Sequence, residues 1–310
     1  MADANFSLGY FTGINTVDPT ARLDPVPVKV GTGMKAAYPL VSASNVEIDN
    51  TYGLSSRAGS TKRLTGTDIH SFWAEGLLGF FMDGTTLYML NYQSGDNYTS
   101  TELLAGLDRA RMSYCQVNDR VYMTNGFYIG YYSNGVMNGL RVTPETYKHI
   151  LPAGQRIAYH KGKLLVAKGK VLYIADALCD HYDVRTGFRV FENDITMLRP
   201  VDEGVYVADG KTWYLIEKRA FADDPAEFKK EPVLDIDAIP FSDTLINGAF
   251  VGEGVEGNVA IWATKEGVCL GDNKGSVKIV TPDYIMPPAI EGAAAIRNLD
   301  GVVHYIATIN

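Results

Sequence analysis

The stretch Val205-Tyr-Val-Ala-Asp-Gly-Lys-Thr-Trp-Tyr-Leu215 contains the pattern on which the fold of this chain depends. A segment of β-branched and aromatic residues is followed by Asp209-Gly210 and then by a second such segment. Val, Tyr and Trp favour strands, and Asp-Gly accepts the positive φ angles of a two-residue hairpin turn. The stretch therefore predicts an antiparallel β-hairpin.

Four further segments repeat this pattern. They are Phe80–Met89, Val121–Ile129, Leu164–Ile174 and Ala260–Leu270. Successive turn glycines lie 41 to 43 residues apart as far as Gly210, and the last step is 57 residues. A period in the low forties is typical of the four-stranded blades of a β-propeller.

A short apolar segment precedes each hairpin, and a sixth such segment follows the last hairpin. The six are His70–Trp73, Arg111–Cys115, Arg156–Tyr159, Ile195–Leu198, Ile246–Phe250 and Ala293–Ile296. The sixth has only Val302–Ile306 behind it, and an unfinished blade would expose backbone donors and acceptors. We therefore expect an all-β, six-bladed β-propeller, closed by N-terminal strands from Asn45–Asp49 or Ser55–Arg63. A double β-sandwich, which also has many short strands, is the alternative.

Residues 1–44 differ from the rest of the chain. They hold four of the 13 prolines and show little periodicity. A segment of this kind has little means of forming its own core. We expect an irregular, proline-rich N-terminal arm over residues 1–44 and the propeller over residues 45–310. The charged stretch Phe221–Pro232 is interpreted as an insertion between blades.

Composition excludes several classes of function. The net charge of −8, with a pI near 5.2, argues against general binding of nucleic acid phosphates. No secretory signal and no apolar run of about 18 residues are present, so we expect no membrane anchor. Cys115, Cys179 and Cys269 are odd in number and widely spaced, which fits a reducing compartment.

No residue set has the spacing of a catalytic or metal site. The chain contains no GxSxG, HExxH or CxxC. Cys179-Asp-His181 is the densest group of metal-ligand types, and we interpret it as a structural loop. Ala208–Trp213 distantly resembles the Asp-box of sialidases, but adjacent Asp209 and Gly210 break that spacing. We expect no catalytic residue, no metal and no cofactor, and predict that the protein is not an enzyme.

The order of several motifs carries a family resemblance. Phe11–Asn15 and Gly53–Arg63 precede His70–Trp73, Asp83–Tyr88 and Asn118–Gly126. In this order the chain resembles a group of tailed-bacteriophage virion proteins over about residues 8 to 130. More loosely, it is similar to the propeller-bearing tail-hub or DNA-stabilisation proteins of short-tailed phages, which introduce their first blade with a comparable basic stretch.

The resemblance implies a non-enzymatic structural role at the neck or tail of a virion. The implied partners are other virion proteins of the neck or tail and further copies of this chain, with packaged DNA nearby but not specifically bound. The implied location is the virion, after synthesis in the bacterial host cytoplasm. The residues expected to make these interactions are Phe11, Ile14, Asn15, Arg22, Arg57, Lys62 and Arg63.

Two other functions remain open at this point. One is a carbohydrate-binding or glycan-cleaving propeller associated with a phage tail. The other is a cytosolic scaffold propeller, although the chain contains no Trp-Asp dipeptide, the signature of the commonest scaffold propellers.

Overall fold

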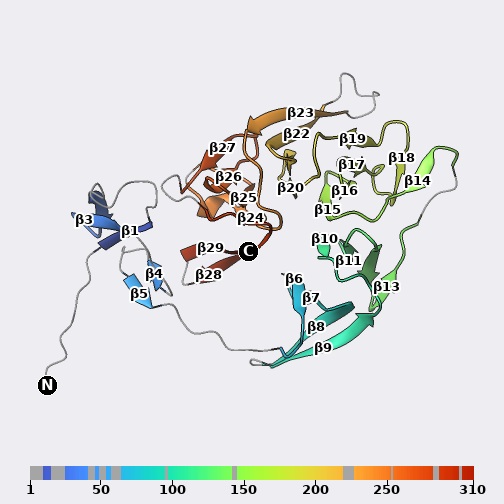
Figure 1. Ribbon diagram of the computed structural model, residues 1–310, viewed down its shortest axis with the longest axis horizontal. Helices are drawn as coiled ribbons and strands as arrows, with labels where there is room; N and C mark the ends of the chain where they lie inside the picture. The colour runs from blue at the N-terminus through green and yellow to red at the C-terminus, as the bar shows by residue number, and fades with distance from the viewer. Residues whose placement is uncertain are drawn as a thin grey trace.

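The computed structural model describes residues 10–14, 25–40, 46–48, 54–56, 64–94, 97–141, 145–218, 227–252, 254–281, 286–299 and 302–310. Most of its strands form five four-stranded antiparallel sheets, each a blade of a β-propeller. Figure 1 shows these blades following one another around a ring. The prediction of an all-β propeller is confirmed. No helix within the described residues is long and apolar enough to cross a membrane.

The blades follow the chain from residue 69 to residue 279. Blade 1 contains β6 (Ile69–Glu75), β7 (Leu78–Asp83), β8 (Thr86–Ser94) and β9 (Asn97–Leu104); blade 2 contains β10 (Ser113–Val117), β11 (Arg120–Thr124), β12 (Ile129–Ser133) and β13 (Val136–Asn138). Blade 3 contains β15 (Arg156–His160), β16 (Lys163–Lys168), β17 (Val171–Ile174) and β19 (Phe188–Val190). Blade 4 contains β20 (Met197–Pro200), β21 (Gly204–Ala208), β22 (Thr212–Lys218) and β23 (Glu227–Leu234); blade 5 contains β24 (Thr244–Asn247), β25 (Asn258–Thr264), β26 (Gly267–Gly271) and β27 (Val277–Ile279).

Within each blade the strands pair in chain order. Blade 3 departs slightly from this rule, because the segment between β17 and β19 carries β18 (His181–Asp183). That strand pairs with β14 (Lys148–Ile150), which precedes the blade, to form a separate two-stranded sheet.

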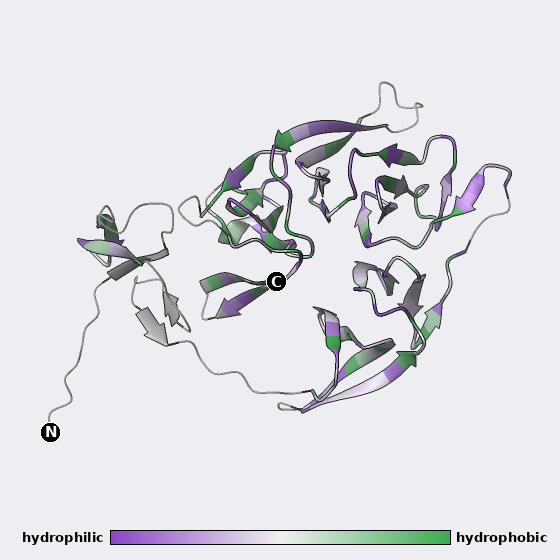
Figure 2. Cartoon of the chain, viewed as in Figure 1, coloured by the Kyte–Doolittle hydropathy of each residue, from purple (hydrophilic) through white to green (hydrophobic). Residues whose placement is uncertain are grey.

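The core is divided among the junctions between blades. Four clusters of buried apolar residues lie between blades 1 and 2, 2 and 3, 3 and 4, and 4 and 5. Trp262, Tyr206, Phe80 and Leu165 are among their fully buried side chains. Figure 2 shows the corresponding hydrophobic stretches along the strands of the blades. Each blade is thus stabilised by its neighbours, as expected for stacked sheets that each have two apolar faces.

The expected number of blades requires a correction. Five sheets have four strands, and the sixth position holds only the two-stranded sheet of β28 (Gly292–Leu299) and β29 (Val302–Ile309). The sixth inner strand was correctly located, but the outer half of its blade is missing from the described residues.

The expected closure by N-terminal strands is also wrong for the described residues. β4 (Val46–Ile48) and β5 (Leu54–Ser56) do form strands, but they pair with each other and not with β29. A local hairpin closes a short loop, whereas pairing with β29 would join segments some 250 residues apart. The smaller entropic cost favours the local pairing. The rest of the second candidate, residues 57–63, lies outside the described residues.

The N-terminal arm is not irregular where it is described. β1 (Tyr10–Ile14), β3 (Gly33–Leu40) and β2 (Val26–Val30) form a three-stranded sheet in that order. Gly31, at φ +60°, opens the tight turn that joins β2 to β3. The prolines were the reason for expecting an irregular segment. Pro27, however, lies in an edge strand, where a missing N–H is tolerated.

The charged stretch near residue 221 does not separate two blades. β22 and β23 pair directly with each other, so the stretch connects and enters the outer strands of blade 4. Phe228, inside this stretch, is buried in the cluster between blades 3 and 4. The charges of β23 are divided between its two faces: Lys229 is exposed, whereas Nζ of Lys230 lies 4.7 Å from the centroid of the Phe191 ring and 4.4 Å from that of Trp213, on the side of Phe228.

Candidate functional site

The outer edge of β29 is uncovered within the described part of the chain. β29 pairs with β28 from Gly292–Ile309 to Leu299–Val302, and neither strand pairs with another. Its sequence, Val-Val-His-Tyr-Ile-Ala-Thr-Ile, has no Lys, Arg, Asp, Glu, Pro or Gly. Edge strands usually carry such residues, which discourage pairing with another chain. This edge therefore has free backbone groups and little protection.

Blade 1 exposes an apolar face on the side away from blade 2. Phe80 and Met82 pack towards blade 2, whereas their strand neighbours point the other way. Four side chains on that opposite side are exposed, namely Phe72 (60%), Leu77 (85%), Tyr92 (51%) and Tyr98 (37%). Together with Leu90 they line a shallow depression of about 360 Å³. We call these five residues the blade-1 face.

The blade-1 face lies in an acidic part of the sequence. Residues 64–104 contain five acidic residues and no Lys or Arg. Two of the acidic side chains, Glu75 and Glu102, are exposed. An apolar face with an acidic surround is suited to a partner surface that is apolar and basic.

One face of the N-terminal sheet is such a surface. Met34 and Tyr38 lie on the same face of β3, are 63% and 48% exposed, and have the exposed Lys29 of β2 paired opposite Met34. Residues 25–40 contain no Asp or Glu. Figure 1 shows this sheet outside the ring of blades.

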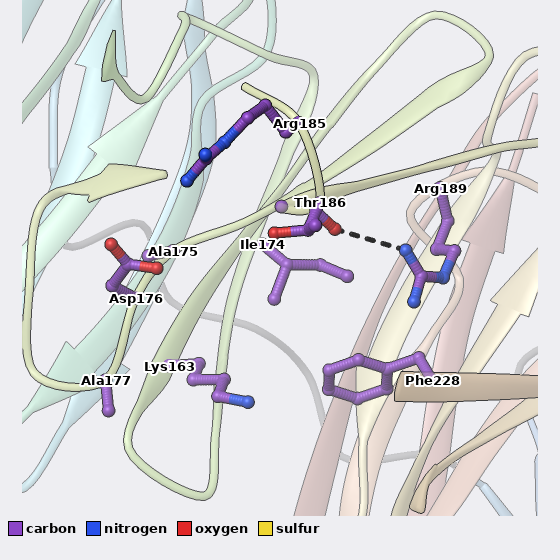
Figure 3. Close-up of a pocket in the computed structure, with 10 residues that line it drawn as sticks. Lys163, Ile174, Ala175, Asp176, Ala177, Arg185, Thr186, Arg189 and Phe228 are labelled. Carbon is purple, nitrogen blue, oxygen red and sulfur yellow. Dashed lines mark hydrogen bonds between the residues drawn. The ribbon is translucent and has the colours of Figure 1, made fainter. Parts of the chain in front are cut away.

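A second hollow, of about 600 Å³, lies between blades 3 and 4 and is lined by several charged side chains (Figure 3). Nζ of Lys163 lies 2.5 Å from a carboxylate oxygen of Glu217. Arg189 Nη1 donates to the carbonyl oxygens of Thr186 and Phe188, at 3.2 and 2.7 Å. The cations of this pocket are thus already engaged by the protein itself.

The carboxylates around this pocket are engaged in the same way. Arg185 donates from Nε and Nη2 to the two oxygens of Asp183, at 3.0 and 2.7 Å. These hydrogen bonds hold the pKa of Asp183 well below its ordinary value. Asp176 accepts from Nζ of Lys148 at 2.6 Å, and that bond raises the pKa of Lys148. We infer that these ion pairs and hydrogen bonds fix the position of the loop that follows β17.

The loop around Cys179-Asp-His181 is anchored by its aspartate. Asp180 is buried and accepts hydrogen bonds from the Tyr122 hydroxyl at 3.0 Å and from the Arg141 backbone N–H at 3.2 Å. His181 Nε2 lies 3.3 Å from a carboxylate oxygen of Asp176. No group of three or more His, Cys, Asp or Glu in the described residues could hold a metal ion. Through Asp180, this loop of blade 3 therefore contacts blade 2, and its role is structural.

Asp209, the central residue of the Asp-box-like stretch, is also structural. It is 1% exposed and accepts from Trp213 Nε1 at 2.6 Å and from the backbone N–H of Glu192 at 2.9 Å. Both carboxylate oxygens thus accept hydrogen bonds from the protein itself, and the side chain is closed off from solvent.

Few of the interaction residues predicted from the sequence can be placed. Phe11 and Ile14 lie in β1, opposite Tyr38 and Leu40 of β3. The other five, Asn15, Arg22, Arg57, Lys62 and Arg63, lie outside the described residues. Sequence reasoning missed the blade-1 face. The sequence did contain an indication of it. β6 and β8 have apolar residues on both faces, but the sixth blade, which would be the second neighbour of blade 1, is incomplete.

Comparison with known proteins adds no family. No protein family and no curated protein sequence matches this chain. Among solved structures, the chain is similar to the WD40 β-propeller domain of Doa1, with 11% identity over 68% of this chain and 67% of that one, at a TM-score of 0.39. It is also similar to BBS1N in complex with ARL6DN (13% identity, 86% of each chain, TM-score 0.46) and to AztD from Citrobacter koseri (10%, 83% and 68%, 0.39). At these identities the likeness concerns the fold alone.

Proposed function

We propose that this protein is a non-enzymatic structural component of a tailed-phage virion, in the neck or tail, and that it acts by protein–protein assembly. The observation that carries the assembly role is the pair of exposed apolar surfaces of opposite charge, the blade-1 face and the N-terminal sheet. The virion setting is supported by the order of sequence motifs between residues 8 and 130.

The proposed contact joins two copies of this chain. The Met34 and Tyr38 face of the N-terminal sheet of one copy covers the blade-1 face of the next, with Lys29 facing Glu102. Because the two surfaces differ, the contact is heterologous, and repeated contacts generate a ring if the rotation closes. Burial of Phe72, Tyr92 and Tyr98 provides the main free energy, and the charges select the partner surface.

A charge-reversal experiment tests this contact. Lys29→Glu should weaken self-association about tenfold, because like charges then face each other across the interface. Adding Glu102→Lys should restore association. The measurement is light scattering coupled to size-exclusion chromatography at low salt. Lys278→Glu, exposed on blade 5, is the matched control.

Two results would contradict the assembly proposal. One is a wild-type protein that stays monomeric over the whole accessible concentration range. The other is equal association of all variants. The virion setting has a separate test, in which purified phage particles are cross-linked and analysed by mass spectrometry; absence of this chain from the particles would refute it.

The aromatic residues of the blade-1 face favour a second candidate, the carbohydrate-binding or glycan-cleaving propeller. Phe72, Tyr92 and Tyr98 offer flat faces on which sugar rings can stack. No carboxylate lines the depression they form, however, whereas glycosidic cleavage needs two. A glycan array separates the candidates: saturable glycan binding lost in Tyr92→Ala would favour this one over assembly.

A further inference from the structure

Three arginines from three consecutive blades meet at one end of the propeller axis. Arg111 lies just ahead of β10, Arg156 opens β15, and Arg199 lies within β20. These are the innermost strands of blades 2, 3 and 4. The side chains of Arg111 and Arg156 lie over the ring of Phe241, in the segment leading into the inner strand of blade 5. Arg199 pairs with Asp243 in the same segment. We call Arg111, Arg156 and Arg199 the axial arginines.

Phe241 is held in an unfavourable backbone conformation at this point. Its φ of +63° lies in the left-handed region, which a bulky side chain rarely adopts. Ser242, fully buried beside it, fixes the chain by donating to the carbonyl oxygen of Ile239 at 2.7 Å and accepting from the N–H of Ala263 at 3.0 Å. The guanidinium carbons of Arg156 and Arg111 lie 3.3 and 4.1 Å from the centroid of the Phe241 ring. Strain of this kind tends to persist where it positions functional groups.

The axial arginines outnumber their carboxylate partners. Arg199 pairs with Asp243, with Nε to Oδ2 at 2.7 Å, and Arg111 Nη1 lies 3.6 Å from Glu291 Oε2. Arg156 has no carboxylate partner of its own among the described residues. The nearby carboxylates of Asp243 and Glu291 favour the positive charge of Arg156, and the nearby guanidinium groups of Arg111 and Arg199 oppose it. The cluster therefore holds three positive charges and two negative ones.

Arg156 is the group left uncompensated. It is only 5% exposed, and its Nε and Nη2 both donate to a single acceptor, the carbonyl oxygen of Thr196, at 3.1 and 2.5 Å. Burial lowers its pKa to about 10. Its Nη1, and Nη2 of Arg111, donate to no group in the described part of the chain. A largely buried guanidinium is costly unless a counter-ion joins it.

We propose that the axial arginines form a binding site for one singly charged oxyanion. Nη1 of Arg156 and Nη2 of Arg111 supply the donors, and the Phe241 ring keeps both guanidinium planes in place. Guanidinium groups match the paired oxygens of carboxylates and phosphates. One bound negative charge would bring the cluster to neutrality. The site is independent of the assembly contact, which involves other residues.

The test uses the full chain and two probes, inorganic phosphate and acetate, each titrated by calorimetry at constant ionic strength. We expect saturable binding with one site per chain. Competition between the probes shows whether the site prefers a phosphate or a carboxylate. Arg111→Gln, at a half-exposed position that should tolerate substitution, should weaken binding about tenfold, the loss expected for one charge-assisted hydrogen bond.

Two further variants complete the test. Arg156→Lys keeps the charge but removes the planar fork, and should also weaken binding. Arg189→Gln, at a half-buried arginine outside the cluster, should bind as the wild type does. Absence of saturable binding of either probe to the wild-type protein, or equal binding by Arg111→Gln, would overturn the proposal. Neither result bears on self-association, so this inference can fail while the proposed function stands.

Discussion

At the scale of single residues, the turn residues of the repeat serve two purposes. Asp83, Asn125 and Asp209 were expected only to form hairpin turns. Each also bonds to the segment that leads into the inner strand of its own blade: Asp83 accepts from the Asp68 N–H, Asn125 donates to the Asp108 carbonyl oxygen, and Asp209 accepts from the Glu192 N–H. The side chain thus joins the middle of a blade to its entrance. The sequence repeat predicts which type of residue lies in the turn, but it does not predict this second hydrogen-bond partner.

Substituting Asp209 should measure this link. In Asp209→Asn the amide NH₂ replaces an oxygen that accepts hydrogen bonds, so a buried donor faces another donor. We expect a loss of about 3 kcal/mol in the free energy of unfolding, measured by urea denaturation. Asp83→Asn, at a half-buried position, is the comparison and should cost less. Equal losses would show that burial does not set the strength of the link.

His160 should make stability depend on pH. It is 3% exposed, its Nε2 has no described partner, and burial together with nearby Lys161 lowers its pKa. The unfolded chain, with an ordinary histidine pKa of about 6.5, then takes up a proton more readily than the folded one. The contribution of neutral His160 to the free energy of unfolding is therefore fully present above about pH 6.5, and it decreases as the pH drops below that value.

The variant His160→Phe isolates this effect. Thermal unfolding between pH 5 and pH 7.5 should show a shallower slope in the variant than in the wild type. Carboxylates with lowered pKa values, such as Asp183, lose their contribution only at more acidic pH. A slope unchanged by the substitution would mean that another group titrates in this range.

At the scale of elements, the contrast between β29 and the outer strands of the blades is informative. β23 carries Glu, Lys and Pro along its length, whereas β29 has none of these. Both lie at the edge of a sheet, but only β23 has the residues that discourage further pairing. The composition of β29 is that of an interior strand, and its exposure follows from the two-stranded state of the sixth sheet.

A charge on β29 should block pairing of its edge with other chains. Thr308 is exposed, so Thr308→Lys should change folding stability by no more than about 0.5 kcal/mol. The variant should show less concentration-dependent association by analytical ultracentrifugation. Thr65→Lys, exposed and ahead of β6, controls for the added charge. Unchanged association would show that the β29 edge does not pair between chains.

At the scale of the whole molecule, stability and assembly reside in different parts. The four apolar clusters use residues between 73 and 279 only, so none depends on the N-terminal sheet. Of the two surfaces proposed for assembly, the blade-1 face lies on the first blade of the series, on the side away from blade 2, and the N-terminal sheet lies outside the ring (Figure 1). Neither is covered by one of the four apolar clusters.

Deleting residues 1–44 should separate the two properties. The truncated protein should keep its strand content, measured by circular dichroism, and a melting temperature within about 5 °C of the wild type, since about 1 kcal/mol corresponds to a few degrees in a protein of this size. It should lose the contact between the N-terminal sheet and the blade-1 face, and with it most of its self-association. A truncated protein that fails to fold would show that the arm supports the propeller, and one that still assembles would leave the arm without the proposed role.

The sequence by itself determined the local pattern. Alternating apolar residues with Asp-Gly and Asn-Gly turns specify hairpins, and their regular spacing specifies blades, because both depend on residues close together in the chain. The inner strands, the repeat and the propeller fold were predictable for that reason. Tertiary structure alone decided how many strands complete the last blade and which faces stay uncovered. It also decided that Arg111, Arg156 and Arg199 meet at the axis. Those outcomes depend on contacts between segments far apart in the chain, which no local pattern records.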